Sequence, residues 1–227
     1  MVILIYGIWG QNWLTGGEGL LVVDDLEGAV YKGFINYALS TSDSFMFVIP
    51  YAAAEVQNAE ELLKNFPSEF RNKKEIYAIW KEREKQSRIE ADIFKNHCIS
   101  FTEKFKPYMI KQRYSSDTQS TVWPSTEIMT SQHNAYSIEF YRTDPETLRN
   151  LLMPHNYFGW RYPYYPEDLS FFRKGRCWTL SSSHEEYIEV YPSNEQEYHR
   201  LINMGINFYD NNFTPYDINK QFYESGI

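Results

Sequence analysis

The chain of 227 residues has few cysteines and no long apolar run, and each shortage argues against a class of protein. Its two cysteines, Cys98 and Cys177, are too few for the disulfide framework of a small secreted domain, so we expect both thiols to be reduced. No run approaches the roughly 20 apolar residues that a membrane-spanning helix needs. The N-terminal stretch MVILIYGIWGQNW lacks the basic start of a signal peptide. We therefore predict a cytoplasmic protein that does not bind a membrane.

Basic residues are also in deficit. The chain has 22 Lys and Arg against 30 Asp and Glu, which gives a net charge of −8. The electrostatic field of this negative charge repels phosphate backbones, so we do not expect nucleic acid as a partner. A basic protein partner is compatible with the charge, because opposite potentials speed association. Acidic proteins also carry such a charge for solubility alone, so the charge permits a partner without identifying one.

Cofactor, metal and catalytic motifs are missing. The stretch Gly16-Gly17-Glu18-Gly19 lacks the spacing and the following Lys-Ser/Thr of a phosphate-binding loop, and a turn is the better interpretation. The five histidines are scattered and form no HExxH pair. The sequence therefore predicts no cofactor and no metal, and it favours a protein without enzymatic activity while leaving an unfamiliar active site open.

Aromatic residues are abundant, at 18% of the chain, and together with 43% hydrophobic residues they indicate a folded protein with a real core. Short runs rich in Val, Ile, Phe and Tyr predict strands in the first half of the chain. These strands are expected at Met1–Trp9, Leu20–Val23 and Phe45–Ile49.

Two helices are predicted between these strands and the middle of the chain. Asn58 with Glu61 is an N-cap pattern that starts a short helix ending near Pro67. A longer helix is expected over Glu69–Lys95, where a loose apolar stripe is flanked by residues of both charges. The simple interpretation is a helix with one solvated face, and the alternative is a helix that binds a partner.

The second half predicts strand, helix, hairpin, strand and helix in that order. The corresponding ranges are Tyr136–Tyr141, Thr147–Met153 after Asp144-Pro145, Leu169–Arg173 and Arg176–Leu180 joined by Lys174-Gly175, Tyr187–Tyr191, and Asn194–Met204. The last helix starts at a Ser193-x-x-Gln196 capping box and ends at Gly205. This order indicates an α+β fold, in which helices pack on one face of one or more antiparallel sheets.

The stretch between Ser115 and Asn134 is poor in core residues and rich in Ser, Thr and Gln. We therefore predict an N-terminal α+β region over residues 1–114, a linker or long loop over 115–133, and a C-terminal α+β domain over 134–227. These parts are two small subdomains or one larger unit, because the length of the chain allows both.

Polar residues concentrate on and after the predicted hairpin. A Cys, a His and carboxylates on adjacent strands can form a thiol nucleophile, a base and an orienting group. A buried structural cysteine and a turn bonded to its own backbone are the alternatives. The candidate residues here are Asp168, Arg176, Cys177, Trp178, His184, Glu185 and Glu186.

The second unusual feature is the aromatic loop, residues 155–165. Tyr, Trp and Arg concentrated in one loop are typical of binding hot spots. The alternative is an ordered loop whose rings cover one end of the sheet. The candidate binding residues in this loop are Tyr157, Trp160, Arg161, Tyr162, Tyr164 and Tyr165.

Residues 166–192, PEDLSFFRKGRCWTLSSSHEEYIEVYP, combine a Pro-Glu-Asp-Leu start, a Gly-x-Cys-Trp hairpin and a Ser-His-Glu turn. In these features the segment resembles a C-terminal segment of uncharacterised small bacterial proteins that are associated with toxin–immunity and other conflict loci. The resemblance implies a toxin, defence or effector protein as partner. It does not extend to the first half of the chain, and it brings no catalytic residues with it.

Three functions follow as hypotheses. The first is an inhibitor of the immunity or anti-defence type, which occludes another protein. The second is a hydrolase that uses His184 and neighbouring carboxylates, and the third is a sensor of a small ligand. The missing motifs favour the binding protein.

Overall fold

A computed structural model describes residues 19–51, 58–64, 74–115, 121–122, 129–130, 136–183 and 185–209. The predicted strand at Met1–Trp9 and the candidate residue His184 lie outside these ranges. Among the described helices, none is both long and apolar enough to cross a membrane.

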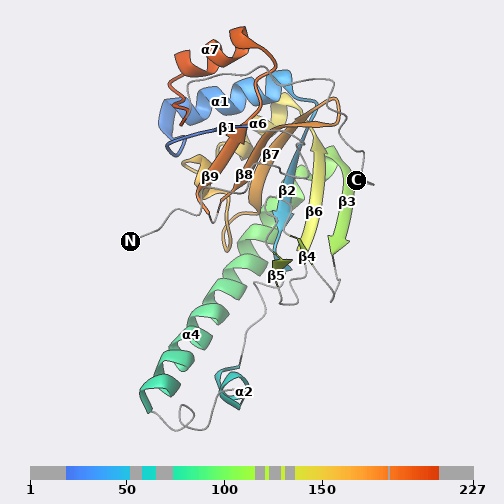
Figure 1. Cartoon of the computed structure of the whole chain (residues 1–227). Helices are drawn as coiled ribbons and strands as arrows, with labels where there is room; N and C mark the ends of the chain where they lie inside the picture. The colour runs from blue at the N-terminus through green and yellow to red at the C-terminus, as the bar shows by residue number, and fades with distance from the viewer. Residues whose placement is uncertain are drawn as a thin grey trace.

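The described residues form an α+β fold around one seven-stranded sheet in which every pair of neighbouring strands is antiparallel (Figure 1). Its strands, in spatial order, are β1 (Leu20–Leu21), β9 (Tyr187–Val190), β8 (Arg176–Ser182), β7 (Glu167–Arg173), β2 (Ser44–Ile49), β6 (Tyr136–Arg142) and β3 (Met109–Ser115). A separate short pair, β4 (Thr121–Val122) with β5 (Met129–Thr130), lies within the predicted linker. The predicted fold class and the strands predicted at Phe45–Ile49 and Tyr136–Tyr141 are confirmed.

The interior strand β2 connects the two halves of the chain. Its sequence SFMFVI is buried along nearly its whole length, as expected for a strand with neighbours on both sides and cover on both faces. It pairs with β6 on one side and with β7 on the other. Strands from both predicted subdomains therefore share one sheet, while the boundary at residues 115–133 lies almost entirely outside the described residues and stays a prediction.

The hairpin between β7 and β8 forms where it was predicted. Its two turn residues, Lys174 and Gly175, have φ angles of 51° and 73°. Positive φ at both central positions is what a two-residue type I′ turn requires, and such a turn matches the right-handed twist of the strands. The Lys-Gly pair therefore sets the register of the hairpin.

Helix α1 (Gly28–Thr41) was not predicted. Its first residue, Gly28, has φ of +56°, and no side chain caps its N-terminus, so the usual start signal is missing. The helical spacing of its buried residues was nevertheless present in the sequence. Those residues are Tyr31, Phe34, Ile35 and Ala38.

Two further helices begin at caps. Asp144 accepts a hydrogen bond from the backbone of Glu146 and starts a 3-10 turn (Pro145–Thr147) that leads into α6 (Leu148–Leu151), within the helix predicted there. Helix α7 (Glu195–Asn203) is capped by Asn194, which accepts from the backbone of Glu197. The predicted Ser193–Gln196 capping box is thus wrong by one residue, while Gly205, with φ of +95°, ends the helix as expected.

The long helix is longer than predicted at its C-terminal end. Helix α4 (Lys74–Ile93) continues without a break through a π-helical turn (Phe94–Cys98), α5 (Ile99–Thr102) and a 3-10 segment (Glu103–Tyr108), a run of 35 residues. Asn58 caps the short α2 (Ala59–Lys64), as its sequence predicted. Figure 1 shows α4 extending away from the sheet with α2 beside its far end, whereas α1 and α7 lie together at the other end of the molecule.

Trp160 lies fully buried at the centre of the main core and joins four elements. Its ring stacks on Phe47 of β2 at 4.8 Å between centroids and also contacts Phe101 of α5. Its Nε1 donates to the hydroxyl of Tyr31 in α1, which in turn donates to the carbonyl of Leu151 in α6. The helices α1, α5 and α6 are thereby fixed to the same face of the sheet.

Replacing Trp160 with Ala is therefore expected to lower the free energy of unfolding by about 3–5 kcal/mol, because a large buried ring is lost and a cavity remains. Tyr164→Ala, in the same loop but at a side chain that is 52% exposed, is the matched control, with an expected change of about 0.5 kcal/mol or less. Urea denaturation followed by fluorescence measures both. A loss below about 1 kcal/mol for Trp160→Ala would contradict the role given to this ring.

Candidate functional site

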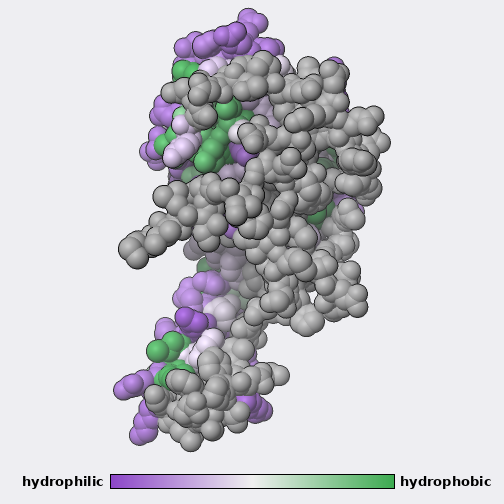
Figure 2. All heavy atoms as spheres, viewed as in Figure 1, coloured by the Kyte–Doolittle hydropathy of each residue, from purple (hydrophilic) through white to green (hydrophobic). Residues whose placement is uncertain are grey.

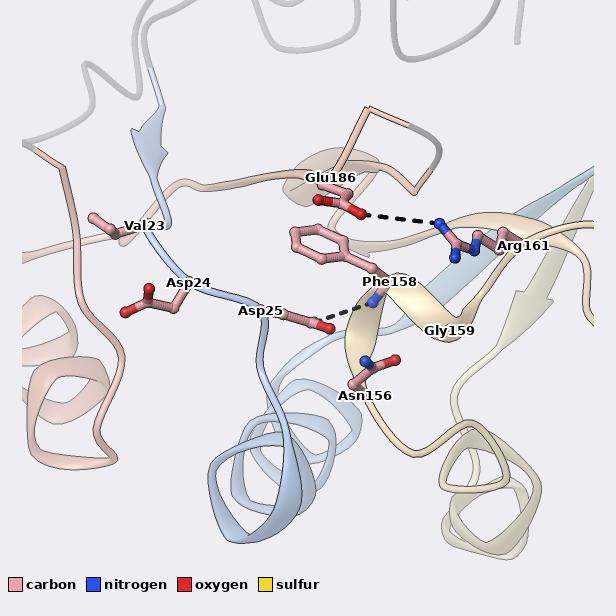
Figure 3. A pocket seen from close by; sticks show the side chains of 8 residues that line it. All are labelled: Val23, Asp24, Asp25, Asn156, Phe158, Gly159, Arg161 and Glu186. Atoms are coloured by element: carbon pink, nitrogen blue, oxygen red, sulfur yellow. Dashed lines mark hydrogen bonds and ion pairs between the residues drawn. The ribbon is translucent and has the colours of Figure 1, made fainter. Parts of the chain in front are cut away.

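A polar pocket of about 360 Å³ opens where the end of β1 meets the aromatic loop and the turn before β9 (Figure 3). Such a volume lies at the small end of the range of known ligand pockets. Its lining residues are Val23, Asp24, Asp25, Asn156, Phe158, Gly159, Arg161 and Glu186. Three carboxylates and one guanidinium thus face one cavity.

Asp25 holds the floor of the pocket in place. Its Oδ1 accepts hydrogen bonds from the backbone N–H groups of Tyr157 and Phe158, at 3.1 and 3.2 Å. These groups belong to the first turn of the 3-10 segment Tyr157–Gly159, whose own N-cap, Asn156, makes no side-chain cap bond. Burial nevertheless raises the pKa of Asp25, because the loss of solvent outweighs these hydrogen bonds.

Arg161 and Glu186 meet across the rim of the pocket. Their ion pair is 4.0 Å long, and their side chains are 54% and 69% exposed, so the pair is loose and weak. Both were candidates from the sequence, where they lie in separate segments. The backbone of Glu186 has φ of 54°, an unusual conformation for a residue other than glycine, and Glu185 beside it is exposed.

Tyr157 and Trp160 do not reach the surface. Both are fully buried in the main core, and the Tyr157 hydroxyl donates to the carbonyl of Leu169 in β7. Their interpretation as surface contacts is therefore incorrect, because a buried ring offers no area to a partner. The alternative, rings that cover one end of the sheet, describes these two residues.

The side chains of the three remaining tyrosines of the aromatic loop pack against the long helix. Tyr162 packs against Phe94, Tyr165 packs edge-on against Phe101, and Tyr164 contacts the ring of His97. Of these, Tyr164 is the most exposed. The loop thus joins the pocket at Arg161 to the base of the long helix.

Cys177 is not an activated nucleophile. It is buried, its thiol contacts the carbonyl of Thr179 at 3.2 Å, and burial raises its pKa well above the ordinary range. A nucleophilic cysteine needs a lowered pKa and an exposed sulfur, so the proposed thiol chemistry is incorrect for this residue. Cys98 is likewise buried, with a raised pKa.

The other hairpin candidates have structural contacts. Trp178 is buried, stacks on Phe34 and lies under the guanidinium of Arg173 at 4.0 Å. Asp168 is completely buried, with φ of 58°, and its Oδ1 accepts from the backbone of Ser183 at 2.7 Å. Arg176 is partly exposed at the start of β8. None of these three lines the pocket.

Six residues of the pocket were not candidates from the sequence, namely Val23, Asp24, Asp25, Asn156, Phe158 and Gly159. Asp24 and Asp25 follow directly after the predicted strand Leu20–Val23, where charged turn residues are common. Nothing in that pattern distinguishes a pocket from an ordinary turn. Only the fold brings this turn to the aromatic loop, through a bridge between Glu27 and Asn156.

A second candidate surface is the arm, which we define as α2 together with α4. Of the 20 residues of α4, only Glu84 and Ala91 have buried side chains. Glu84 fastens α2 to α4: its carboxylate accepts from the backbone of Ala59 at 3.3 Å and pairs with Lys81 and Arg88 at 3.0 and 2.8 Å. Arg88, then Lys81 and the Ala59 N–H, lower the pKa of Glu84 to about 2.

The side of α4 that faces away from α2 carries apolar residues in solvent. Ile79 and Ile89 are 56% and 46% exposed. At about 100° per residue, both point away from the side of Glu84. Hydrophobic side chains reach the surface of the arm among hydrophilic ones in Figure 2.

Comparisons with protein-family models, curated proteins and solved structures found no match for this chain. Within the part of the chain that the structure describes, no three His, Cys, Asp or Glu side chains are grouped so as to hold a metal ion. The eight residues that line the pocket include no Ser, Thr, Cys or His to act as a nucleophile. The predicted hydrolase site depends on His184, which lies outside the described residues, and stays untested.

Glu167, the first residue of β7, makes stability depend on pH. Burial, and then the charge of Asp168, raise its pKa from 4.5 to about 8, although the backbone N–H of Tyr162 donates to it. Between pH 4.5 and 8 the unfolded chain loses this proton while the folded chain keeps it. The stability that Glu167 contributes is therefore fully present below about pH 4.5 and is lost as the pH rises through this window.

Glu167→Gln removes that titration but keeps an acceptor for Tyr162. From pH 5 to pH 8, the variant should lose about 3 kcal/mol less stability than the wild type. Urea denaturation at several pH values measures the difference, with the exposed Glu82→Gln as control. Parallel pH profiles for wild type and Glu167→Gln would rule out a buried protonated carboxyl at this position.

Proposed function

We propose that this protein binds another protein and occludes its functional site, with the arm as the principal contact. The observation that carries this proposal is the scarcity of buried side chains along α4, which is 20 residues long and extends beyond the body (Figure 1). Helices in proteins draw most of their stability from packing an apolar face. A partner that covers the outer face of α4 would supply such packing.

The length and composition of the arm fit a helix-in-groove contact. Twenty residues span about 30 Å, enough to lie along a groove or enter a cleft. Ile79 and Ile89 supply apolar anchors on one side, separated by charged residues that keep the free protein soluble. The occupant that this face fits is a protein with an apolar groove.

Charge indicates the character of that partner. The chain carries a net charge of −8, which attracts a basic protein and repels an acidic one. Toxins and effectors that are held inactive by a bound acidic protein are partners of this kind. The inhibitor of a bacterial conflict system implied by the resemblance of residues 166–192 is the form of this function that we propose.

The proposal is tested by photo-crosslinking from the arm in the native host. A photoreactive residue at position 79 or 89 should capture one and the same protein, while the same residue at position 202, on the exposed side of α7, should not. With purified proteins, Ile79→Gln/Ile89→Gln should weaken binding of that protein at least about tenfold without lowering stability, since Gln retains helix propensity.

Ile202→Gln is the matched control, because it also replaces an exposed helical isoleucine. The inhibitor function further requires that the activity of the captured protein is lost in the complex and returns with the double variant. Binding that is unaffected by the double variant would reject the arm as the contact surface. A complex that leaves the partner fully active would reject occlusion.

A further inference from the structure

The pocket at Asp25 carries uncompensated negative charge. Among the residues that the structure describes, the lining of the pocket holds three carboxylates, Asp24, Asp25 and Glu186, and one cation, Arg161, which is half exposed and makes a loose pair of 4.0 Å with Glu186. Among the described residues, no basic side chain pairs with Asp25, whose hydrogen-bond donors are backbone N–H groups. Within the described part of the chain, Asp24 accepts a hydrogen bond from a neutral group, the side-chain amide of Asn207 at 3.3 Å. The cavity is thus one in which a further positive charge is favourable.

An aromatic ring lies between these carboxylates. Phe158 is partly buried and packed on the main core, and Figure 3 shows its ring within the pocket, between the carboxylates of Glu186 and Asp25. The face of an aromatic ring attracts ammonium and guanidinium groups, and neighbouring carboxylates add to that attraction. Phe158 and the carboxylates therefore favour the same kind of ligand by two different interactions.

The walls of the pocket are well fixed. A Cβ at Gly159 would come within 2.8 Å of Asn156 Oδ1 and 3.0 Å of Pro154, so the backbone here is as close to its neighbours as glycine allows. The bridge between Glu27 and Asn156 and the bonds to Asp25 hold the opposite side. A volume of about 360 Å³ admits a group of the size of a basic side chain.

We propose that this pocket binds an organic cation, an alkylammonium or guanidinium group, which is held over Phe158 by Asp25 and Glu186, while Asp24 adds negative charge at the edge of the pocket. The cation enters beside Arg161 and competes with it for Glu186. The same chemistry is offered by a free amine and by a lysine or arginine side chain on a protein, and the experiment separates these two sources. The pocket is separate from the arm, so the test of cation binding does not depend on whether the arm binds a partner.

Calorimetric titration of the full-length protein is the test. The probes are agmatine and 1,5-diaminopentane as free cations, and glycine-flanked pentapeptides with a central arginine or lysine as protein-borne cations. The same pentapeptide with citrulline, which has the shape of arginine without its charge, is the neutral control. Binding of agmatine as strong as that of the arginine peptide assigns the site to a free cation; a peptide preference of about tenfold or more assigns it to a protein side chain.

Four variants report on the pocket. Glu186→Gln and Asp24→Asn should each weaken binding about three- to tenfold, and Phe158→Leu, which keeps an apolar side chain, about two- to fivefold. Arg161→Ala should strengthen it, because the competing cation is gone. Glu195→Gln, an exposed glutamate on α7, removes the same charge elsewhere and should leave the affinity unchanged. Asp25 is not replaced, because its carboxylate accepts hydrogen bonds from the backbone of Tyr157 and Phe158 and its loss would disturb the pocket.

The proposal is overturned if no cation binds up to about 10 mM, a limit that corresponds to negligible affinity. It is equally overturned if the citrulline peptide binds as well as the arginine peptide, or if the pocket variants and Glu195→Gln behave alike. Unchanged circular dichroism and urea midpoints show that the variants remain folded, so that lost binding reports on the pocket itself.

Discussion

The structure depends on the burial of Trp160. Its ring stacks on Phe47 of the interior strand β2, contacts the long helix at Phe101 and bonds through Tyr31 to the helices on the same face. The aromatic loop is thus part of the core at Tyr157 and Trp160 and exposed at Arg161 and Tyr164. Phe158 and Arg161, on either side of this anchored residue, can line a pocket because Trp160 fixes the backbone between them.

The two candidate surfaces, the pocket and the arm, differ in how closely they are packed against the main core. The pocket rests on elements packed into the main core, so its shape is set by the fold. The arm is held together mainly by contacts between its own two helices. Glu84 joins α2 to α4 through backbone and charged contacts, and few side chains of α4 are buried. Local opening is easiest where few apolar contacts are made, which suits a segment that adapts to another molecule.

Sequence patterns predicted those elements whose signals are local. Lys174-Gly175 identified the hairpin, and Asn58 and Gly205 identified helix ends, because turn and cap chemistry acts within a few residues. The same patterns missed α1, which begins at Gly28 without a side-chain cap. The start of α7 was misplaced by one residue because Ser and Asn are both good caps.

The site was less predictable than the fold for a physical reason. Arg161 and Glu186 were candidates on residue type, yet their meeting depends on the turn before β9, and Asp25 reaches the loop from more than a hundred residues away in sequence. Trp160 shows the opposite error. Residue type made it a contact candidate, and only its position in three dimensions showed that its contacts are internal.

The π-helical turn Phe94–Cys98 has a consequence for the arm. It joins the packed end of the long helix to the exposed end, and each residue gained or lost within a helix rotates everything beyond it by about 100°. The direction in which Ile79 and Ile89 point relative to the body therefore depends on the number of residues in this short segment. A single insertion or deletion there would change the direction of the arm without altering the arm's own sequence, and it would also move Phe94 or Cys98 out of the buried cluster that they form with Ile49.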